Sequence, residues 1–337
     1  MCASPELSEF LPAIKGALAC SGQNLFANFR QIVGRHLSQL NFEPVENWVF
    51  LGDSLTEGVG SNRISYVTEL AAQLRCPEQH KYVQQLRLRR VNPQQFDRFV
   101  NFNIAGHMNV DNQDGGGSWL WNLACEGQTI ESDFGWLPLI RVLRPEVVVI
   151  FRGSLESIIR PAMVLDGDWP GWVPRSWRGY AAMDPRCYFS TTWWRKAKQS
   201  SIDSLKQSVR HKLLTVRPGK PLIDLELLAR YLTDLIQRLR AVNTRVVVLG
   251  LLPVDQTQFP NSPEYFQSVN ARLEKIATAE GAEFFDWGSL LPANGDLFYR
   301  DGFHPNKAGA CALANILREY LTEPRAVAPG KSRVSAV

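Results

Sequence analysis

The sequence predicts an α/β fold in which a mostly parallel sheet lies between two layers of helices. Apolar runs such as VVVI at 147–150 are rich in β-branched residues, which is typical of strands covered on both faces. Segments with apolar residues at three- and four-residue spacing alternate with these runs along the chain. Strands joined through helices are usually parallel, and functional residues gather at their carboxyl ends.

The predicted elements follow one another in a regular order. Residues 1–45 show helical periodicity and are predicted to be a helical extension of the main domain, 46–322. Strands are expected at 47–53, 96–105, 119–125, 147–150, 246–251 and 283–286. Helices are expected at 63–75, 129–143, 222–240, 264–280 and 305–321, with Pro305 in the first turn of the last one. Residues 323–337 are predicted to be a flexible tail.

Between residues 157 and 220 the rhythm of strands and helices breaks and the composition changes. This stretch holds five of the 10 tryptophans, and residues 151–220 carry 13 Lys and Arg against 5 Asp and Glu. We interpret 157–220 as a Trp- and Arg-rich insert. On the simpler interpretation, its tryptophans form the small core of an inserted subdomain. On the functional interpretation the insert is a lid, whose aromatic residues bind an acyl chain or a sugar face.

The overall composition excludes several classes of protein. Of the 337 residues 45% are hydrophobic and 21% are charged, which is typical of a globular chain and not of a disordered one. No uninterrupted apolar run is long enough to cross a membrane, and no signal peptide is recognisable. The 6 cysteines are scattered without a CxxC pair, which predicts reduced thiols and a cytoplasmic protein.

The stretch LGDSLTEG at 51–58 directly follows the first apolar run and holds more polar groups than a turn needs. Ser54 therefore lies at the predicted carboxyl end of a strand, where a nucleophile is expected. A serine hydroxyl needs a neighbouring base to react at neutral pH. The structural alternative is a helix cap, because Ser54 followed by Glu57 matches a capping box. Asp53 is interpreted as a structural hydrogen-bonding residue.

A base for Ser54 is predicted near the other end of the chain. His304 stands in YRDGFHPNKAG at 299–309, after the last predicted strand and before the last helix, and Asp301 lies three residues earlier. On a turn, that spacing lets the carboxylate bind Nδ1 of the imidazole and leaves Nε2 for the serine. Ser54, His304 and Asp301 are therefore the predicted catalytic residues. The structural alternative is that Asp301 and His304 only form a turn and a helix cap.

GDSLTEG and DGFHPNKAG together resemble the first and last sequence blocks of the GDSL/SGNH hydrolase family. The resemblance covers residues 47–153 and 245–321. It implies a flavodoxin-like sandwich and a serine hydrolase in which Ser54 is the nucleophile, His304 the base and Asp301 its orienting partner. It also implies an oxyanion hole that uses the backbone of Ser54 and of a glycine from a middle block. Gly127 in NLACEGQT is the preferred glycine, and Gly106 in NFNIAGH is its rival.

The chain departs from the family pattern after the strand at 147–150. The family carries GxND there, whereas this chain has GSLE, so that Leu155 replaces the asparagine whose side-chain amide would donate to the oxyanion. Loss of one such donor costs about 10²–10³ in rate. Arg152, Ser154 or a group from the insert are the candidates to replace it, each also explicable as an ordinary structural residue.

Three functions follow from these residues. The first is a serine hydrolase that cleaves an ester or thioester through an acyl-enzyme on Ser54, without cofactor or metal. The second is an acyltransferase that passes the same acyl group to an alcohol or amine. The third is a catalytically inactive binding module. The basic insert would suit an acidic partner such as a phosphorylated ligand or an acyl carrier protein. No nucleic-acid partner is predicted, because no binding motif accompanies the basic residues.

Overall fold

The computed structural model describes residues 46–58, 65–74, 118–124, 126–137, 140–141, 144–179, 182–185, 187, 192–292 and 296–323. Their centre is a five-stranded sheet with the order β2-β1-β3-β6-β7. Every neighbouring pair in it is parallel, as the alternation of strands and helices predicts. The strands are β1 (Glu46–Gly52), β2 (Ser118–Asn122), β3 (Val147–Phe151), β6 (Arg245–Leu249) and β7 (Glu283–Phe285).

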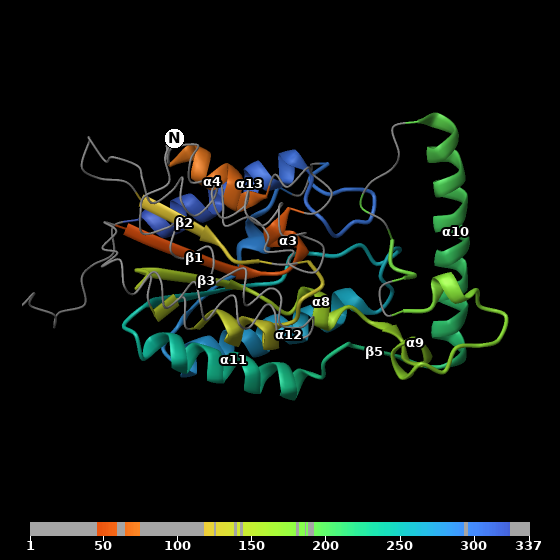
Figure 1. The fold of residues 1–337 in the computed structure, drawn as a ribbon, viewed down its shortest axis with the longest axis horizontal. Helices are drawn as coiled ribbons and strands as arrows, with labels where there is room; N and C mark the ends of the chain where they lie inside the picture. Colours follow the sequence, from red (N-terminus) through yellow and green to blue (C-terminus); the bar gives the residue numbers. More distant parts are fainter. Residues whose placement is uncertain are drawn as a thin grey trace, which may run out of the picture.

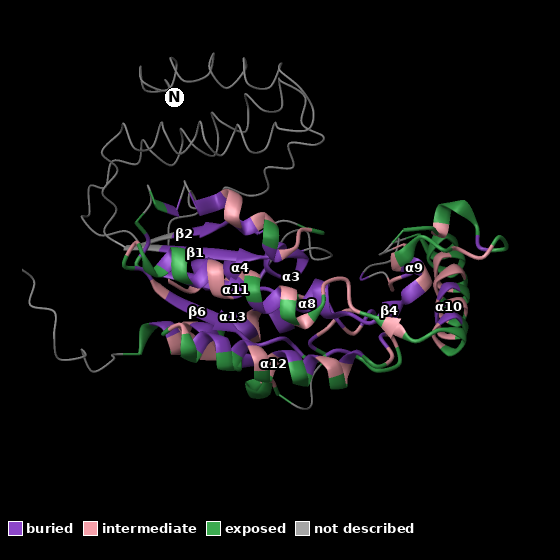
Figure 2. Ribbon diagram, turned by 90° about the horizontal axis from the view of Figure 1, so that it is seen from below, coloured by how far each residue is buried: buried purple, intermediate pink, exposed green. Residues whose placement is uncertain are grey.

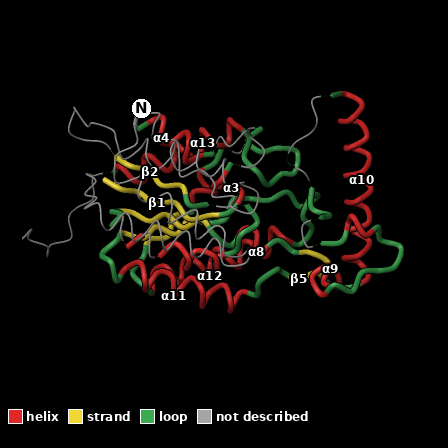
Figure 3. Tube along the Cα trace, in the orientation of Figure 1, coloured by secondary structure: helices red, strands yellow, loops and turns green. Residues whose placement is uncertain are grey.

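Helices cover both faces of the sheet and complete the three layers (Figures 1 and 3). One layer contains α4 (Tyr66–Gln73) and α13 (Lys307–Thr322), and the other contains α11 (Leu225–Arg240) and α12 (Ser262–Ala279). The predicted α/β/α sandwich is therefore confirmed. All five residues of β3 are buried, which explains why its sequence is apolar on both faces. In Figure 2 buried residues mark the sheet and the inner faces of these helices.

Helix ends follow the local sequence. Asp224 caps α11 by accepting the N–H of Leu227 at 2.8 Å, and Asn306 caps α13 by accepting the N–H of Gly309 at 3.1 Å. Because Asn306 is the cap, Pro305 lies before α13 and not in its first turn, where it was predicted. Pro305 instead forms an isolated antiparallel bridge with Phe298.

The structure differs in part from the predicted secondary structure between β2 and β3. A helix was expected over 129–143, and the described residues of this range are largely helical: a 3₁₀ helix, η3 (Ile130–Trp136), is followed by α-helical residues at 137 and 140–141. Buried polar contacts described below, which no periodicity reveals, hold the start of this segment. The predicted extension at 1–45, the strand at 96–105 and residues 324–337 of the predicted tail lie outside the described residues.

The insert contains β4 (Arg160–Pro161), α9 (Ala162–Asp166), η4 (Arg175–Trp177), α10 (Trp193–Val216) and β5 (Gly219–Lys220). The 24-residue α10 lies beyond the carboxyl ends of the strands (Figure 1), within a stretch where the sequence shows no regular rhythm. Its buried residues are Lys206, Arg210 and Leu213, so that an apolar stripe is largely missing.

A small apolar cluster holds the insert together. Val164, Met183 and Leu213 are buried in it, and Trp169 and Trp177 pack against them. The three other tryptophans of the insert are exposed, with exposed fractions of 58% for Trp172, 79% for Trp193 and 50% for Trp194. The tryptophans therefore divide between a subdomain core and its surface. Among the described helices, none is both long and apolar enough to span a membrane.

Candidate active site

Ser54 is placed at the carboxyl end of β1 by a short helix, α3 (Ser54–Glu57). The cap of this helix is Asp53, whose Oδ1 accepts the N–H of Leu55 at 3.0 Å. Ser54 is thus the first residue inside the helix, and its interpretation as the cap is wrong. Gly52 is required just before it, because a Cβ there would overlap the side chain of Thr56.

The other polar residues of LGDSLTEG fasten α3 to its surroundings. Thr56 Oγ1 lies 3.0 Å from the hydroxyl of Tyr66 on α4, and the carbonyl of Thr56 accepts the side-chain amide of Asn122 at 2.9 Å. The carboxylate of Glu57 accepts the N–H of Glu126. These contacts join α3 to both neighbouring segments and leave the Ser54 side chain to face the last loop of the domain.

That loop holds Asp301 and His304 in the geometry predicted from their spacing. Asp301 is buried, and its Oδ1 accepts the N–H groups of Phe303 at 3.1 Å and His304 at 3.0 Å. Gly302 between them adopts φ +62°, and a Cβ there would overlap Asp255. The turn thereby presents the second carboxylate oxygen to the imidazole.

The structure brings the three predicted residues together. His304 Nδ1 lies 2.7 Å from Asp301 Oδ2, and His304 Nε2 lies 2.9 Å from Ser54 Oγ. An imidazole that carries its proton on Nδ1 donates it to Asp301 and offers Nε2 as acceptor for the serine proton. The arrangement can therefore raise the nucleophilicity of Ser54 and stabilise the imidazolium that follows.

Gly127 lies in a turn at 126–127 and adopts φ +71°. The bond from the N–H of Glu126 to Glu57 holds the turn against α3. The turn thus stands near the helix that carries Ser54, as an oxyanion glycine requires. The rival Gly106 lies outside the described residues.

The guanidinium group of Arg152 binds other groups of the protein interior. Its Nε and Nη2 donate to the two oxygens of Asp133 at 2.7 and 2.5 Å, and Nη1 donates to the carbonyl of Gln128 at 2.6 Å. The side chain is only 1% exposed. Arg152 is therefore a residue that positions the segment carrying Gly127, and these bonds do not favour a direct role toward the oxyanion.

Glu156 holds the same segment from the other side. Its Oε1 accepts the N–H of Ile130 at 2.7 Å, and its Oε2 accepts the N–H of Gly153 at 3.1 Å. Burial raises the pKa of Glu156 to about 6, and the charge of Arg152 opposes this shift. Glu156 thus links the loop after β3 to the start of η3.

The remaining candidates of that loop are buried. Leu155 is 9% exposed and offers no side-chain donor. The hydroxyl of Ser154 is fully buried and has no hydrogen-bond partner among the described residues. Burial also raises the pKa of Asp53, while the charge of Arg152 lowers it. Ser154 therefore remains the candidate for the missing donor.

Cys187 of the insert approaches the same site. Its Sγ, a carboxylate oxygen of Asp301 and a ring nitrogen of His304 lie within 4.8 Å of one another, a set that could hold a metal ion. Burial, with a smaller contribution from the charge of Asp301, raises the pKa of this thiol to about 12. A neutral thiol is a poor nucleophile, so that Ser54 is the better candidate nucleophile beside His304.

A small cavity adjoins Ser54 and His304 and extends between α3 and the starts of α4 and α13. Tyr66, Ser65 and Ala310 contribute to its wall.

Sequence reasoning found Ser54, Asp301 and His304 but missed the residues that support them. The structure adds Glu57, Asp133 and Glu156 as buried acidic groups that accept backbone or guanidinium donors. A signal existed for Glu156, because a carboxyl in the GSLE stretch directly after a buried strand is as unusual as the aspartate and glutamate of LGDSLTEG. Asp133 carried no comparable signal.

Comparison with protein families gives one match. The model of the GDSL-like Lipase/Acylhydrolase family matches residues 190–311, a range that contains Asp301 and His304 but not Ser54. No curated protein with a similar sequence was found.

Several solved structures are similar at low identity. TesA is 16% identical, with 82% of this chain and 98% of that chain covered and a TM-score of 0.44. An acetylxylan esterase from Geobacillus stearothermophilus is 14% identical, with 83% and 95% covered and a TM-score of 0.44. An α/β hydrolase from the metagenome of Lake Arreo, Spain, is 15% identical, with 82% and 94% covered and a TM-score of 0.44. The family match supports a hydrolase and confirms the resemblance to the GDSL/SGNH hydrolases that the two motifs predict.

Proposed function

We propose that the chain is a serine hydrolase that cleaves an ester or thioester through an acyl-enzyme on Ser54. The observation that carries this proposal is the continuous row from Asp301 through His304 to Ser54, with separations of 2.7 and 2.9 Å. Residues 250 positions apart in the chain meet at hydrogen-bonding distance. A structural role alone does not require that contact.

The proposed reaction follows the geometry. Ser54 Oγ attacks the acyl carbon while its proton passes to Nε2 of His304, and Asp301 stabilises the imidazolium. His304 then returns the proton to the departing alcohol or thiol, and water releases the acid by the reverse sequence. The backbone N–H groups of Ser54 and Gly127 are the proposed oxyanion donors, and Ser154 is proposed to supply the third.

The acyltransferase remains the second candidate, because one observation favours it. Cys187 brings the insert beside Asp301 and His304, so that the insert covers part of the site as a lid would. A lid that excludes water favours transfer to an alcohol or amine over hydrolysis.

The free thiols of Cys187 and Cys311 support the cytoplasmic location predicted above.

A fluorophosphonate probe tests the proposal. Wild-type protein should be labelled on Ser54, and Ser54→Ala should not be labelled. Ser289→Ala is the matched control, because it removes an exposed serine whose hydroxyl donates to the carbonyl of Asp286, and it should still be labelled. A folded wild-type protein that resists labelling would favour the inactive binding module.

The acceptor is tested separately. Unlabelled wild-type enzyme is incubated with an activated ester in the presence of a series of alcohols and amines, and the products are separated and identified. Free acid as the main product supports the hydrolase. Acylated acceptor as the main product would assign the acyltransferase.

A further inference from the structure

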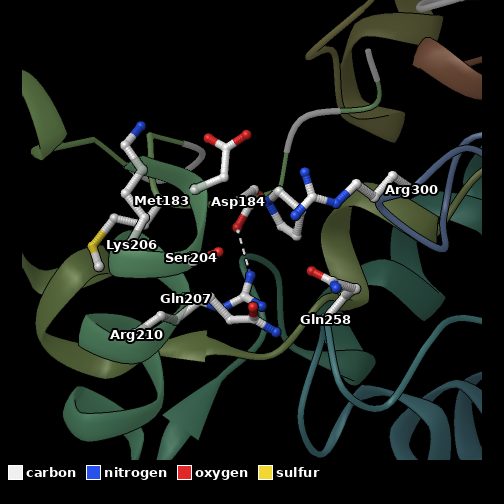
Figure 4. A pocket seen from close by; sticks show the side chains of 10 residues that line it. Met183, Asp184, Ser204, Lys206, Gln207, Arg210, Gln258 and Arg300 are labelled. Carbon is white, nitrogen blue, oxygen red and sulfur yellow. Dashed lines mark ion pairs between the residues drawn. The ribbon is translucent and has the colours of Figure 1, made fainter. Parts of the chain in front are cut away.

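A cavity between the insert and the sandwich is built around a buried arginine. Arg210 on α10 is 1% exposed, yet none of its three guanidinium nitrogens has a hydrogen-bond partner among the described residues. The nearest described carboxylate is Asp184, whose Oδ1 lies 3.7 Å from Nη1 of Arg210 (Figure 4). A buried guanidinium normally satisfies its five donors, because leaving them unpaired is costly.

Asp184 does not balance the local charge. Its Oδ2 already accepts two bonds from Arg160, at 3.0 and 2.7 Å, so that one carboxylate serves two buried guanidinium groups. Burial lowers the pKa of Arg210 to about 10, which still leaves it charged at neutral pH. Positive charge therefore exceeds negative charge in this buried cluster.

The cavity beside Arg210 has the lining of an anion site. Figure 4 shows Arg210 and Arg300 reaching toward the same space from opposite sides, one from α10 and the other from the loop before α13. Ser204, Gln207 and Gln258 add polar groups to the wall, and Lys206 adds a third cation. Asp184 and Asp203 are the two acidic residues in that lining. Planar guanidinium groups bind carboxylate and phosphate through paired hydrogen bonds.

This cavity lies next to the proposed catalytic residues. Arg300 directly precedes Asp301 in the chain. Asp184 is three residues from Cys187, whose Sγ belongs to the 4.8 Å cluster with Asp301 and His304. Three residues span at most about 11 Å. We therefore expect a molecule whose anionic group is held by Arg210 to reach Ser54 as well.

We propose that the substrate carries a carboxylate or phosphate group and that Arg210 and Arg300 bind it in this cavity. The substrate assignment rests on the proposed hydrolase function, whereas anion binding by the cavity does not. The insert thereby contributes the residue that selects anionic substrates.

The competing explanation is purely structural. Arg210 lies over the ring of Phe259, with 5.1 Å between Cζ and the ring centroid. Such a contact stabilises a protein only modestly and leaves the hydrogen-bond donors unused. A structural arginine predicts no effect of anions on the protein, which separates the two explanations.

Binding is tested first on Ser54→Ala, which cannot turn over substrate. Inorganic phosphate should raise the melting temperature by about 2 °C or more relative to sodium chloride of equal ionic strength. Acetate in a parallel series shows whether a carboxylate binds as phosphate does. Adding Arg210→Gln or Arg300→Gln should abolish the phosphate effect, and Arg238→Gln, an exposed arginine on α11, should preserve it. Equal melting temperatures in phosphate and chloride would overturn the proposal.

Selectivity is tested on the active enzyme with two matched esters. They are 4-nitrophenyl hydrogen glutarate, which bears a carboxylate, and its neutral methyl-capped analogue. Wild type should prefer the anionic ester in kcat/KM. Arg300→Gln should reduce that preference about 10-fold and Arg210→Gln by at least as much, while Arg238→Gln keeps it. An unchanged preference in Arg300→Gln, a substitution at an exposed position, would contradict the proposal.

The two tests separate the two proposals. If phosphate binds Ser54→Ala but wild type cleaves no ester, the hydrolase is wrong and the anion site stands. If both esters are cleaved with equal preference in every variant, the hydrolase stands and the anionic substrate is wrong.

Discussion

The row formed by Asp301, His304 and Ser54 differs from the insert cavity in how its buried polar groups are hydrogen-bonded. In the row, Asp301 is buried and its two oxygens accept bonds from His304 and the neighbouring backbone. In the cavity, Arg210 is equally buried and has no hydrogen bond among the described residues. A satisfied network positions groups for chemistry on an incoming molecule, whereas an unsatisfied one needs that molecule to complete it. The first site is therefore complete in the free protein, and the second is completed by its ligand.

The sharpest way to break this comparison is Ser54→Ala. Removal of the nucleophile should lower ester turnover by about 10⁴-fold or more, because His304 then has no hydroxyl to activate. Anion binding in the insert cavity should persist in the same variant. Steady-state hydrolysis and phosphate-dependent melting measure the two sites separately. Substantial residual turnover in a folded Ser54→Ala would remove Ser54 from the mechanism.

Asp301→Asn tests whether the satisfied network matters for chemistry. The amide can still accept backbone N–H groups through its oxygen, so the turn should fold. Its NH₂ would face Nδ1 of His304 and favour the wrong tautomer, and kcat should fall about 10³–10⁴-fold. Melting temperature and kcat should thus respond differently. A variant that keeps more than a tenth of wild-type kcat would show that Asp301 does not orient the base.

Arg152→Met tests the positioning of the Gly127 segment. The substitution leaves the Asp133 carboxylate buried without its ion pair and should lower the free energy of unfolding by about 3–5 kcal/mol. Urea denaturation measures this loss. The double variant Arg152→Met, Asp133→Leu should recover much of the stability without recovering full activity. A single variant as stable as wild type would show that the pair contributes no structural support.

Glu156 gives the smallest expected effect and a defined dependence on pH. Its pKa is raised to about 6 in the folded chain, against 4.5 for the free side chain. The folded state thus binds the proton more tightly, and the free energy of unfolding loses about 2 kcal/mol as the pH rises through this range. Glu156→Gln should lack that loss.

Urea denaturation of both proteins at pH values below and above this window measures the difference. The stability of wild type relative to Glu156→Gln should fall as the pH rises. A relative stability that rises with pH would mean that the carboxylate, and not the protonated acid, is the favoured form in the fold.

The sequence predicted the sheet and the proximity of Asp301 to His304 because both leave short-range patterns. VVVI at 147–150 shows its burial on both faces, and the three-residue spacing of Asp301 and His304 suits one turn. The predicted fold also put Ser54 at the edge of the sheet where the structure has it, since the carboxyl ends of parallel strands meet at one edge.

Other features depend on contacts that have no local pattern. Glu156 binds the backbone at the start of η3, and Arg152 binds the carbonyl of Gln128. The sequence predicted a helix over 129–143 but could not predict that its first part is a 3₁₀ helix. Helix α10 buries Lys206 and Arg210 in place of an apolar stripe, and periodicity could not reveal it. The unsatisfied state of Arg210 depends on Asp184 and Arg160, which lie at least 26 positions earlier in the chain.

The acyl-enzyme itself is the most direct test of the central claim. Wild-type protein is mixed with an activated ester, quenched in acid within the first turnover, digested and analysed by mass spectrometry. One acyl group on the peptide that contains Ser54, absent from His304→Ala, is the predicted result. Acylation of Cys187 instead, or ester consumption with no acylated peptide, would contradict the proposed mechanism.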